Sequence, residues 1–190
     1  WLDLKKKPIW IHCKGYLVRD DNMKPLYMIG CVNEIGKRQK ADNVSGLLGE
    51  SGFREYMNQL DTPLETGYLL RIGIDHFKEI NDNFGQEYGD FVLKKTAECI
   101  SGCTSEGQKV YKLVADEFLI LDVASDEAKD ADKLYDKVRE AIDRFIETNE
   151  FKVMYTVSGG IVPFAALKGN QCSEALKLTD FALNEAKKLG

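Results

Sequence analysis

The chain has 190 residues, of which 44% are hydrophobic and 30% are charged, and its formal net charge is −5. These proportions are typical of globular proteins and exclude a disordered or fibrous chain. The acidic balance disfavours nucleic-acid binding through a broad basic face. No apolar run approaches the length of a transmembrane helix, so we expect no membrane segment in this chain.

Five cysteines are present, an odd number, and no pair has the spacing C-x-x-C. This pattern favours neither a disulfide framework nor a zinc site, and it indicates reduced thiols in the cytosol. No signal peptide is recognisable. We therefore expect a cytoplasmic protein. The chain opens at Trp1 inside a strand-like pattern, and we expect it to be a piece of a longer protein.

The first 35 residues predict a β-hairpin. Residues 9–18 and 26–32 are rich in β-branched and aromatic side chains, and the segment RDDNMKP between them is a turn cluster. A lone hairpin is marginally stable in water, so these strands require a partner sheet. The polar segment EIGKRQKADN that follows has no core of its own and indicates a connector.

From Asp42 onward, helical and strand patterns alternate. Strand-turn-strand pairs mixed with helices predict an α+β fold with a largely antiparallel sheet. The expected elements are a helix at 51–60 capped by Ser51, a strand at 67–75, a short helical turn and loop at 76–90, a helix at 91–100, two strands within 109–124, a helix at 126–149, one or two strands within 152–164 and a helix at 173–189.

Two acidic residues, Asp116 and Glu117, lie side by side between two apolar strand runs. At a hairpin tip both carboxylates can point outward, and paired carboxylates are ligands that hard divalent cations prefer. The alternative is an ordinary polar turn, and the pair alone does not decide between the two.

A second polar cluster follows the strand at 67–75, a position that favours ligand sites. Lys78 could neutralise a phosphate, and Asn81 and Asp90 could form hydrogen bonds with a purine edge. The alternative is a turn-rich loop in which Asn and Asp side chains cap their own backbone.

Together these segments resemble the GGDEF domains of the diguanylate cyclase family. IGIDHFKEINDNFGQEYGDFVL resembles the family's block D-x-D-x-F-K-x-I-N-D-x-x-G-x-x-x-G-D-x-x-L, and VYKLVADEFLIL stands at the R-x-G-G-D/E-E-F hairpin. ADNVSGLLGESGF, YTVSGGI and DFALNEAKKLG resemble the opening, the late strand and the closing helix. The five blocks cover residues 42–190. The upstream residues resemble the last strands of a PAS sensor domain and its exit linker.

The resemblance implies a ferredoxin-like, nucleotidyl-cyclase core, with PAS strands at 1–35, a signalling linker at 36–43 and a GGDEF domain at 44–190. Family members condense two GTP molecules into cyclic di-GMP in a homodimer, with Mg²⁺ or Mn²⁺ ions neutralising the phosphates. By resemblance, guanine would contact Asn81 and Asp90, the phosphates would contact Phe77, Lys78 and Lys187, and metal would contact the Ile74 carbonyl, Asp116 and Glu117, with Asp116 and Glu117 as the catalytic acids.

Two departures from the family pattern bear on activity. Gly73 stands where the family has the leading aspartate of D-x-D, a metal ligand, and Val114-Ala115 replaces the Gly-Gly pair that lets the backbone approach the nucleotide. Residues that only support a metal ligand already contribute about 10–100-fold to activity, so the loss of a direct ligand is expected to cost more.

We therefore expect a catalytically impaired member of a cyclic di-GMP signalling protein, which acts as a GTP-binding or regulatory module. Two alternatives stay open: an active diguanylate cyclase that tolerates these changes, and a purely structural dimerisation module. A cyclic di-GMP phosphodiesterase domain is a common neighbour in the family and is a further expected partner.

Overall fold

The computed structural model describes residues 10–35, 41–60, 63–123, 125, 129–148, 153–168 and 171–189. The chain divides into two compact units, residues 1–41 and 42–190. In the first unit, β1 (Trp10–Arg19) and β2 (Pro25–Ile35) form an antiparallel hairpin with Tyr16 opposite Ile29. The predicted hairpin is therefore present, and its PAS origin stays a prediction. Residues 36–40 of the predicted connector lie outside the described residues.

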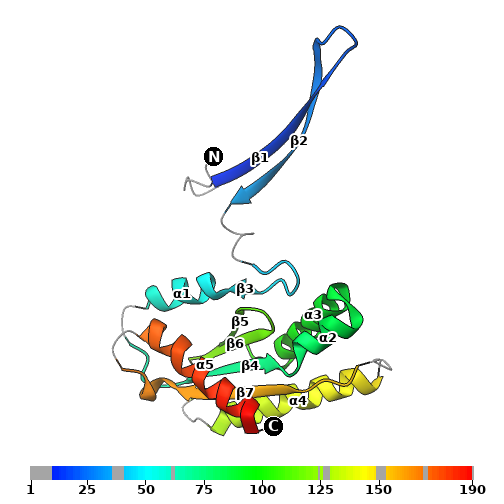
Figure 1. Ribbon diagram of the computed structural model, residues 1–190. Coiled ribbons are helices and arrows are strands. Elements are labelled where there is room, and N and C mark those ends of the chain that lie inside the picture. The colour runs from blue at the N-terminus through cyan, green and yellow to red at the C-terminus, as the bar shows by residue number, and fades with distance from the viewer. Residues whose placement is uncertain are drawn as a thin grey trace. The chain divides into compact units, whose positions relative to one another are not determined.

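The second unit is a mixed sheet with helices on both faces (Figure 1). The strand order is β3-β5-β6-β4-β7, in which only the short β3–β5 pair is parallel. Its elements are β3 (Leu48–Gly49), α1 (Glu50–Asn58), β4 (Tyr68–Ile74), α2 (Phe77–Phe84), α3 (Gln86–Cys103), β5 (Gln108–Lys112), β6 (Glu117–Asp122), α4 (Lys129–Thr148), β7 (Val157–Pro163), a 3₁₀ turn (Phe164–Ala166) and α5 (Gln171–Leu189). The predicted largely antiparallel α+β sheet is confirmed.

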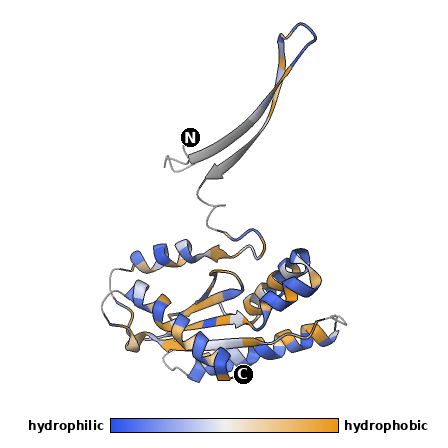
Figure 2. Cartoon of the chain, in the orientation of Figure 1, coloured by the Kyte–Doolittle hydropathy of each residue, from blue (hydrophilic) through white to orange (hydrophobic). Residues whose placement is uncertain are grey.

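Two hydrophobic cores sandwich the sheet, because alternate residues of each strand face opposite sides. On one face Leu70 and Ile72 of β4 pack with the helices α2, α3 and α4, and on the other Leu69 packs with α1 and α5. All seven residues of β4 are buried, which fits its central position between β6 and β7. Figure 2 shows hydrophobic residues along the strands and hydrophilic residues on the outer sides of the helices.

Three details of the predicted elements are corrected. The segment 76–90 is mostly helical: α2 and α3 are separated only by Gly85, whose φ of +86° glycine adopts without strain. The first helix begins at Glu50 with Gly49 as its N-cap, so Ser51 is not the cap. The two-residue strand β3 was not expected.

Of the helices in the described part of the chain, none is long and apolar enough to cross a membrane.

Gly160 sets how closely β7 and α5 can approach. A Cβ atom at Gly160 would lie 2.4 Å from the backbone nitrogen of Leu183. We therefore expect Gly160→Ala to destabilise the domain by about 1–3 kcal/mol, because the helix must move away from the sheet. Gly102→Ala is the matched control, since a Cβ at Gly102 meets nothing within 4 Å. Urea denaturation measures the free energy of unfolding of both variants, and equal values for the two would contradict the prediction.

Candidate functional site

Three segments converge where β4 ends. Asp116 lies in the turn between β5 and β6, and its carbonyl oxygen accepts a hydrogen bond from the backbone N–H of Ile74. Gly73 of β4 stands directly opposite Glu117 of β6. Lys187 lies in the last turn of α5, and its ammonium reaches the Ile74 carbonyl oxygen at the end of β4. The structure thus brings together Ile74, Asp116 and Lys187, three of the residues that the resemblance assigns to metal or phosphate.

The Lys187 side chain occupies the space over Gly73. A Cβ atom at Gly73 would lie 2.8 Å from both Cε and Nζ of Lys187 and 3.1 Å from Cδ2 of Leu183. Any larger residue at Gly73 would require this lysine to move. The Lys187 side chain can therefore take this position because residue 73 has no side chain.

The Lys187 ammonium is bound to two oxygen atoms. Its Nζ lies 3.1 Å from Oδ2 of Asp116 and 3.5 Å from the carbonyl oxygen of Ile74. The Lys187 and Asp116 side chains are 30% and 16% exposed, so the pair is partly shielded from water. These two oxygens are the ones that the resemblance assigns to a divalent metal.

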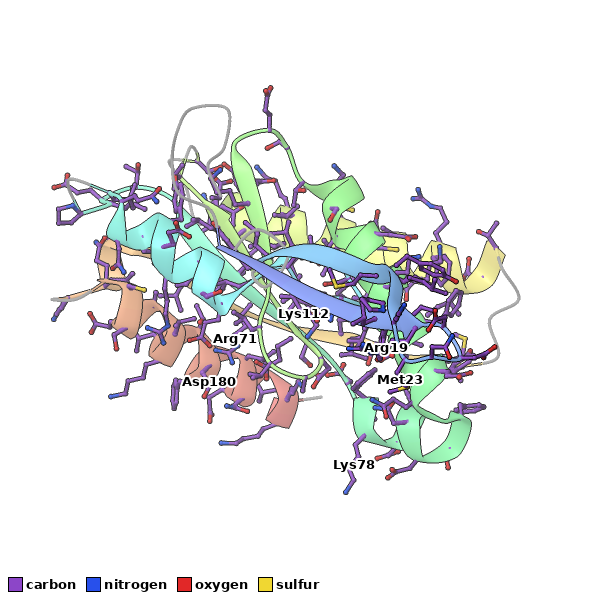
Figure 3. All side chains as sticks on the ribbon, turned by 90° about the horizontal axis from the view of Figure 1, so that it is seen from above. Arg19, Met23, Arg71, Lys78, Lys112 and Asp180 are labelled. Carbon is purple, nitrogen blue, oxygen red and sulfur yellow. The ribbon has the colours of Figure 1, made fainter. Side chains whose placement is uncertain are left out.

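Glu117 is held by Arg71, a buried residue of β4. The Arg71 guanidinium donates to the Glu117 carboxylate through Nε at 2.8 Å and also through Nη2. It also donates to the Leu176 carbonyl at 3.1 Å and forms an ion pair of 3.0 Å with Asp180 of α5. Figure 3 labels Arg71 and Asp180 beside each other at α5. The Glu117 carboxylate is therefore neutralised inside the chain.

A further buried cation lies behind the turn. Lys112 is 4% exposed and donates to the Ala115 carbonyl. Burial lowers the pKa of the Lys112 ammonium, and the nearby carboxylates of Asp42, Asp116 and Glu117 oppose that shift. Ala115 itself has a φ of +49°, a conformation that favours the glycine found in the family. Val114 is exposed.

Arg71 and Lys112 were not among the predicted site residues. The signal was present in the sequence, because each is a charged residue inside an otherwise apolar strand run, YLLRIGI and VYKLV. Buried charges are rare unless they are paired. A search for such residues would have selected Arg71 and Lys112, without showing which carboxylates they pair with.

The residues predicted to bind guanine lie on α2 and α3. The Asn81 side chain rests on Gly89, where a Cβ atom would be 1.9 Å from Asn81 Oδ1 and 3.3 Å from the Phe77 ring. Asp90 is the next residue of α3. Asn81 Oδ1 is buried and has no hydrogen-bond partner among the described residues. A buried amide oxygen without a partner is costly, and a ligand N–H group would satisfy it.

Phe77 and Lys78 form the first turn of α2. Neither the N-cap His76 nor any other side chain caps this helix, so its first amide groups remain available as donors for an anion. The Lys78 side chain is exposed, and Figure 3 shows it pointing away from the body of the domain. The roles of these residues stay predictions.

Lys187 also lines a small pocket of about 200 Å³, together with Asp75, His76, Thr156 and Ser158. The Asp75 carboxylate accepts hydrogen bonds from Thr156 Oγ1 at 2.6 Å and from Ser158 Oγ at 2.7 Å. These bonds hold the Asp75 carboxylate against Thr156 and Ser158, at the start of β7. Among the described residues that line this pocket, Lys187 is the only lysine or arginine.

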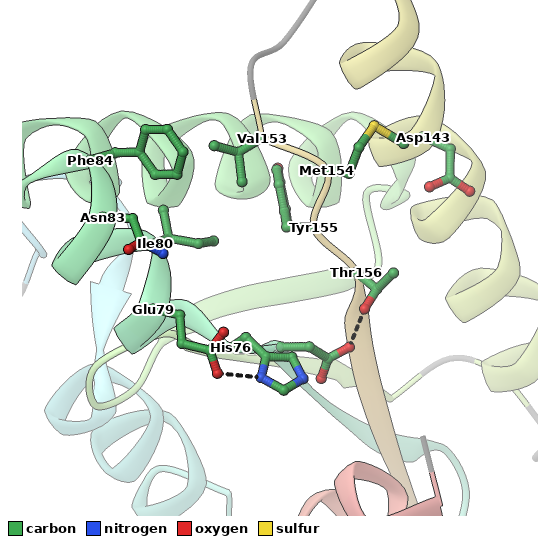
Figure 4. A pocket seen from close by; sticks show the side chains of 11 residues that line it. His76, Glu79, Ile80, Asn83, Phe84, Asp143, Val153, Met154, Tyr155 and Thr156 are labelled. Carbon is green, nitrogen blue, oxygen red and sulfur yellow. Dashed lines mark hydrogen bonds and ion pairs between the residues drawn. The ribbon is translucent and has the colours of Figure 1, made fainter.

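A larger pocket of about 280 Å³ shares Asp75, His76 and Thr156 with the small one (Figure 4). His76 Nδ1 lies 2.9 Å from Oε1 of Glu79 at its rim, and Asp143 of α4 adds another carboxylate. The acidic rim disfavours a phosphate group, so a phosphate fits better on the Lys187 side.

The residues present do not fit a divalent cation in the arrangement that the structure shows. Mg²⁺ requires close octahedral coordination by oxygen. Here the oxygens are one carboxylate, Asp116, and one carbonyl, Ile74, both bound by Lys187, while Glu117 is bound by Arg71. Across the described ranges, no group of three or more His, Cys, Asp or Glu residues is placed to hold a metal ion.

Comparison with known proteins identifies the family. The family model described as "Diguanylate cyclase, GGDEF domain" matches residues 40–190. Diguanylate cyclase VdcA of Vibrio cholerae is 25% identical over 186 residues, which cover 94% of this chain and 54% of that protein. The probable diguanylate cyclase DgcT of Escherichia coli is 31% identical over 146 residues, 73% of this chain and 31% of that protein. The chain thus spans about half the length of VdcA and less of DgcT.

Solved structures agree on the fold. A sensory box/GGDEF family protein from Caulobacter crescentus has a TM-score of 0.66 at 23% identity, and the match covers 80% of this chain and 99% of that chain. Diguanylate cyclase SiaD of Pseudomonas aeruginosa has a TM-score of 0.66 at 22% identity and covers 81% of this chain and 60% of its own. With the family model spanning most of its length, this chain belongs to the diguanylate cyclase GGDEF domain family.

Proposed function

We propose that this chain is a regulatory domain of a cyclic di-GMP signalling protein that binds GTP without converting it to cyclic di-GMP. The observation that carries the proposal is the Lys187 ammonium beside Gly73, bound to Asp116 and the Ile74 carbonyl. Phosphoryl transfer in such sites depends on metal ions that neutralise the phosphates and activate the attacking hydroxyl. Here Asp116 and Glu117 are bound by Lys187 and Arg71, so they are not available to hold the metal ions that would activate the hydroxyl.

Guanine recognition is the part of the site that supports binding. Asn81 Oδ1 is a buried acceptor without a partner among the described residues, and Asp90 directly follows Gly89, the residue of α3 on which the Asn81 side chain rests. An amide oxygen and a carboxylate are both acceptors, and guanine offers a ring N–H and an amino group on one edge. The uncapped first turn of α2 adds amide donors for the phosphates.

The wider setting belongs to the same proposal. We place the chain in the cytoplasm as a homodimer, with residues 1–35 as the end of a PAS sensor domain and 36–43 as the linker that transmits its signal. A phosphodiesterase domain is a suitable neighbour to be regulated. GTP binding to this domain would then make the degradation of cyclic di-GMP depend on the GTP concentration.

The test is incubation of the chain with GTP and Mg²⁺, followed by chromatography, alongside measurement of GTP affinity by calorimetry. We expect no cyclic di-GMP. We expect Asn81→Ala to lower GTP affinity about tenfold, because a buried hydrogen bond is lost, and Asn83→Ala, on the same helix but exposed, to leave it unchanged. Equal affinities of the two variants would contradict the assigned guanine site.

Active cyclase is the second candidate. Asp116 and the Ile74 carbonyl converge on one point, and they could take a metal if Lys187 were drawn away by the phosphates. Cyclic di-GMP from the unchanged chain would support this candidate and reject the first. Absence of both product and GTP binding would favour a structural dimerisation module.

A further inference from the structure

The acidic turn carries two carboxylates, and each already has a cation from the chain itself. Asp116 is paired with Lys187 at 3.1 Å, and Glu117 is paired with Arg71 at 2.8 Å. The two cations come from different elements, α5 and β4, and approach the turn separately. The arrangement is therefore neutral before any ion or ligand arrives.

The Lys187 side chain occupies the space that a metal-binding side chain at position 73 would need. Its Nζ is 2.8 Å from the position of a Cβ at Gly73, and it is bound to Asp116 and to the Ile74 carbonyl. A divalent ion bound to the same two oxygens would lie against the ammonium, and like charges at such a distance repel strongly in a partly shielded site. Lysine and metal are thus mutually exclusive there.

We propose that Lys187 is the resident cation of this site, in place of a divalent metal ion, and that a phosphate-bearing ligand binds against it without Mg²⁺. The ligand part rests on the proposed function, whereas the exclusion of metal does not. An ammonium has three N–H donors, and Lys187 uses two of them on Asp116 and Ile74. The third is available for a phosphate oxygen in the small pocket that Lys187 lines.

The proposal gives Gly73 a definite role. A carboxylate at Gly73 would have to displace Lys187, so glycine at this position is what lets the lysine reach the two oxygens. Arg71 acts in the same direction, because a Glu117 carboxylate that accepts two guanidinium donors is not free to complete a metal site. The glycine at position 73, where the family has aspartate, and the pairing of Glu117 with Arg71 therefore both disfavour metal binding.

Direct measurement of Mn²⁺ binding tests the exclusion of metal. Free Mn²⁺ is followed by electron paramagnetic resonance with the unchanged chain, Lys187→Met, Lys188→Met and Gly73→Asp/Lys187→Met. Lys188 is the matched control, because it is the next residue of α5 and pairs with Glu185 at the surface. We expect no binding by the unchanged chain or Lys188→Met, weak binding by Lys187→Met with a Kd of about 1 mM, and binding at least about tenfold tighter by the double variant.

Two results would overturn the proposal. The first is Mn²⁺ binding by the unchanged chain as tight as that by Lys187→Met. The second is no binding by the double variant when its circular dichroism spectrum shows it folded, since removal of the lysine and restoration of the carboxylate should then suffice. If Lys187→Met does not fold, Lys187→Gln, which keeps a polar group of similar length, takes its place in the same comparison.

The ligand part has its own measurement. We expect the affinity for GTP to change by less than about twofold when Mg²⁺ is replaced by EDTA. We expect Lys187→Met to lose about tenfold or more in EDTA, because the phosphate then loses the ammonium against which it is proposed to bind. An affinity that falls tenfold in EDTA in the unchanged chain would contradict the proposal. No GTP binding under any condition would reject the proposed function and the ligand part, while the Mn²⁺ results would still decide the exclusion of metal.

Discussion

Restoring three family residues together, Gly73→Asp, Val114→Gly and Ala115→Gly, should raise cyclic di-GMP synthesis by about 10³-fold or more over the unchanged chain, because a direct metal ligand contributes more than the 10–100-fold of its supporting residues. The aspartate would displace Lys187, whose ammonium lies 2.8 Å from the position of the new Cβ, and would thereby release Asp116 and the Ile74 carbonyl for a metal ion. The glycines would remove the strained φ of +49° at Ala115 and the β-branched Val114 from the turn.

The control is the same triple variant with Asp116→Asn, which should return synthesis to the level of the unchanged chain. The readout is cyclic di-GMP separated by chromatography after incubation with GTP and Mg²⁺ at high protein concentration. Gly73→Asp alone should recover part of the gain, and the glycine pair alone should recover little, since the metal site would still lack its carboxylate. Synthesis by the Asp116→Asn control would show that the product comes from another site or from a contaminant.

The sequence predicted the strands and the long helices well, because their patterns are local. β4 is an apolar run apart from Arg71, and β5 and β6 flank an acidic turn. Errors arose where local composition misled. The segment around Gly85 is rich in Asn, Asp and Gly and indicated a loop, yet α2 and α3 form there because Ile80 and Val92 pack into the core.

The sequence predicted part of the candidate site, but it did not predict Arg71, Lys112 or the contacts between the residues. Motif spacing placed Ile74, Asp116, Glu117 and Lys187 in one list of residues, but the Lys187–Asp116 pair joins positions 71 residues apart and the Arg71–Glu117 pair joins positions 46 apart. Such pairs depend on how α5 and β6 dock on β4, which no local pattern specifies. The same holds for the approach of Lys187 to Gly73.

Arg71→Met should produce the largest loss of stability of any substitution considered. The Arg71 side chain is 7% exposed and holds Glu117, which is 19% exposed, together with Asp180 and the Leu176 carbonyl. Methionine fills similar space without charge, so the variant leaves a shielded carboxylate without its partner. Removing one member of a buried ion pair costs about 3–5 kcal/mol, and we expect a loss of that size in the free energy of unfolding from urea denaturation.

The surface pair Arg54–Glu50 provides the matched control, since its side chains are 48% and 42% exposed and are separated by one helical turn. Arg54→Met should cost about 0.5 kcal/mol or less. The double variant Arg71→Met/Glu117→Gln should recover part of the lost stability, because it removes the unpaired charge and leaves a group that needs only ordinary hydrogen bonds. If Arg71→Met cost no more than Arg54→Met, Glu117 would not depend on Arg71. Its carboxylate would then be free to turn toward the site, and the account of a turn neutralised from within the chain would fail.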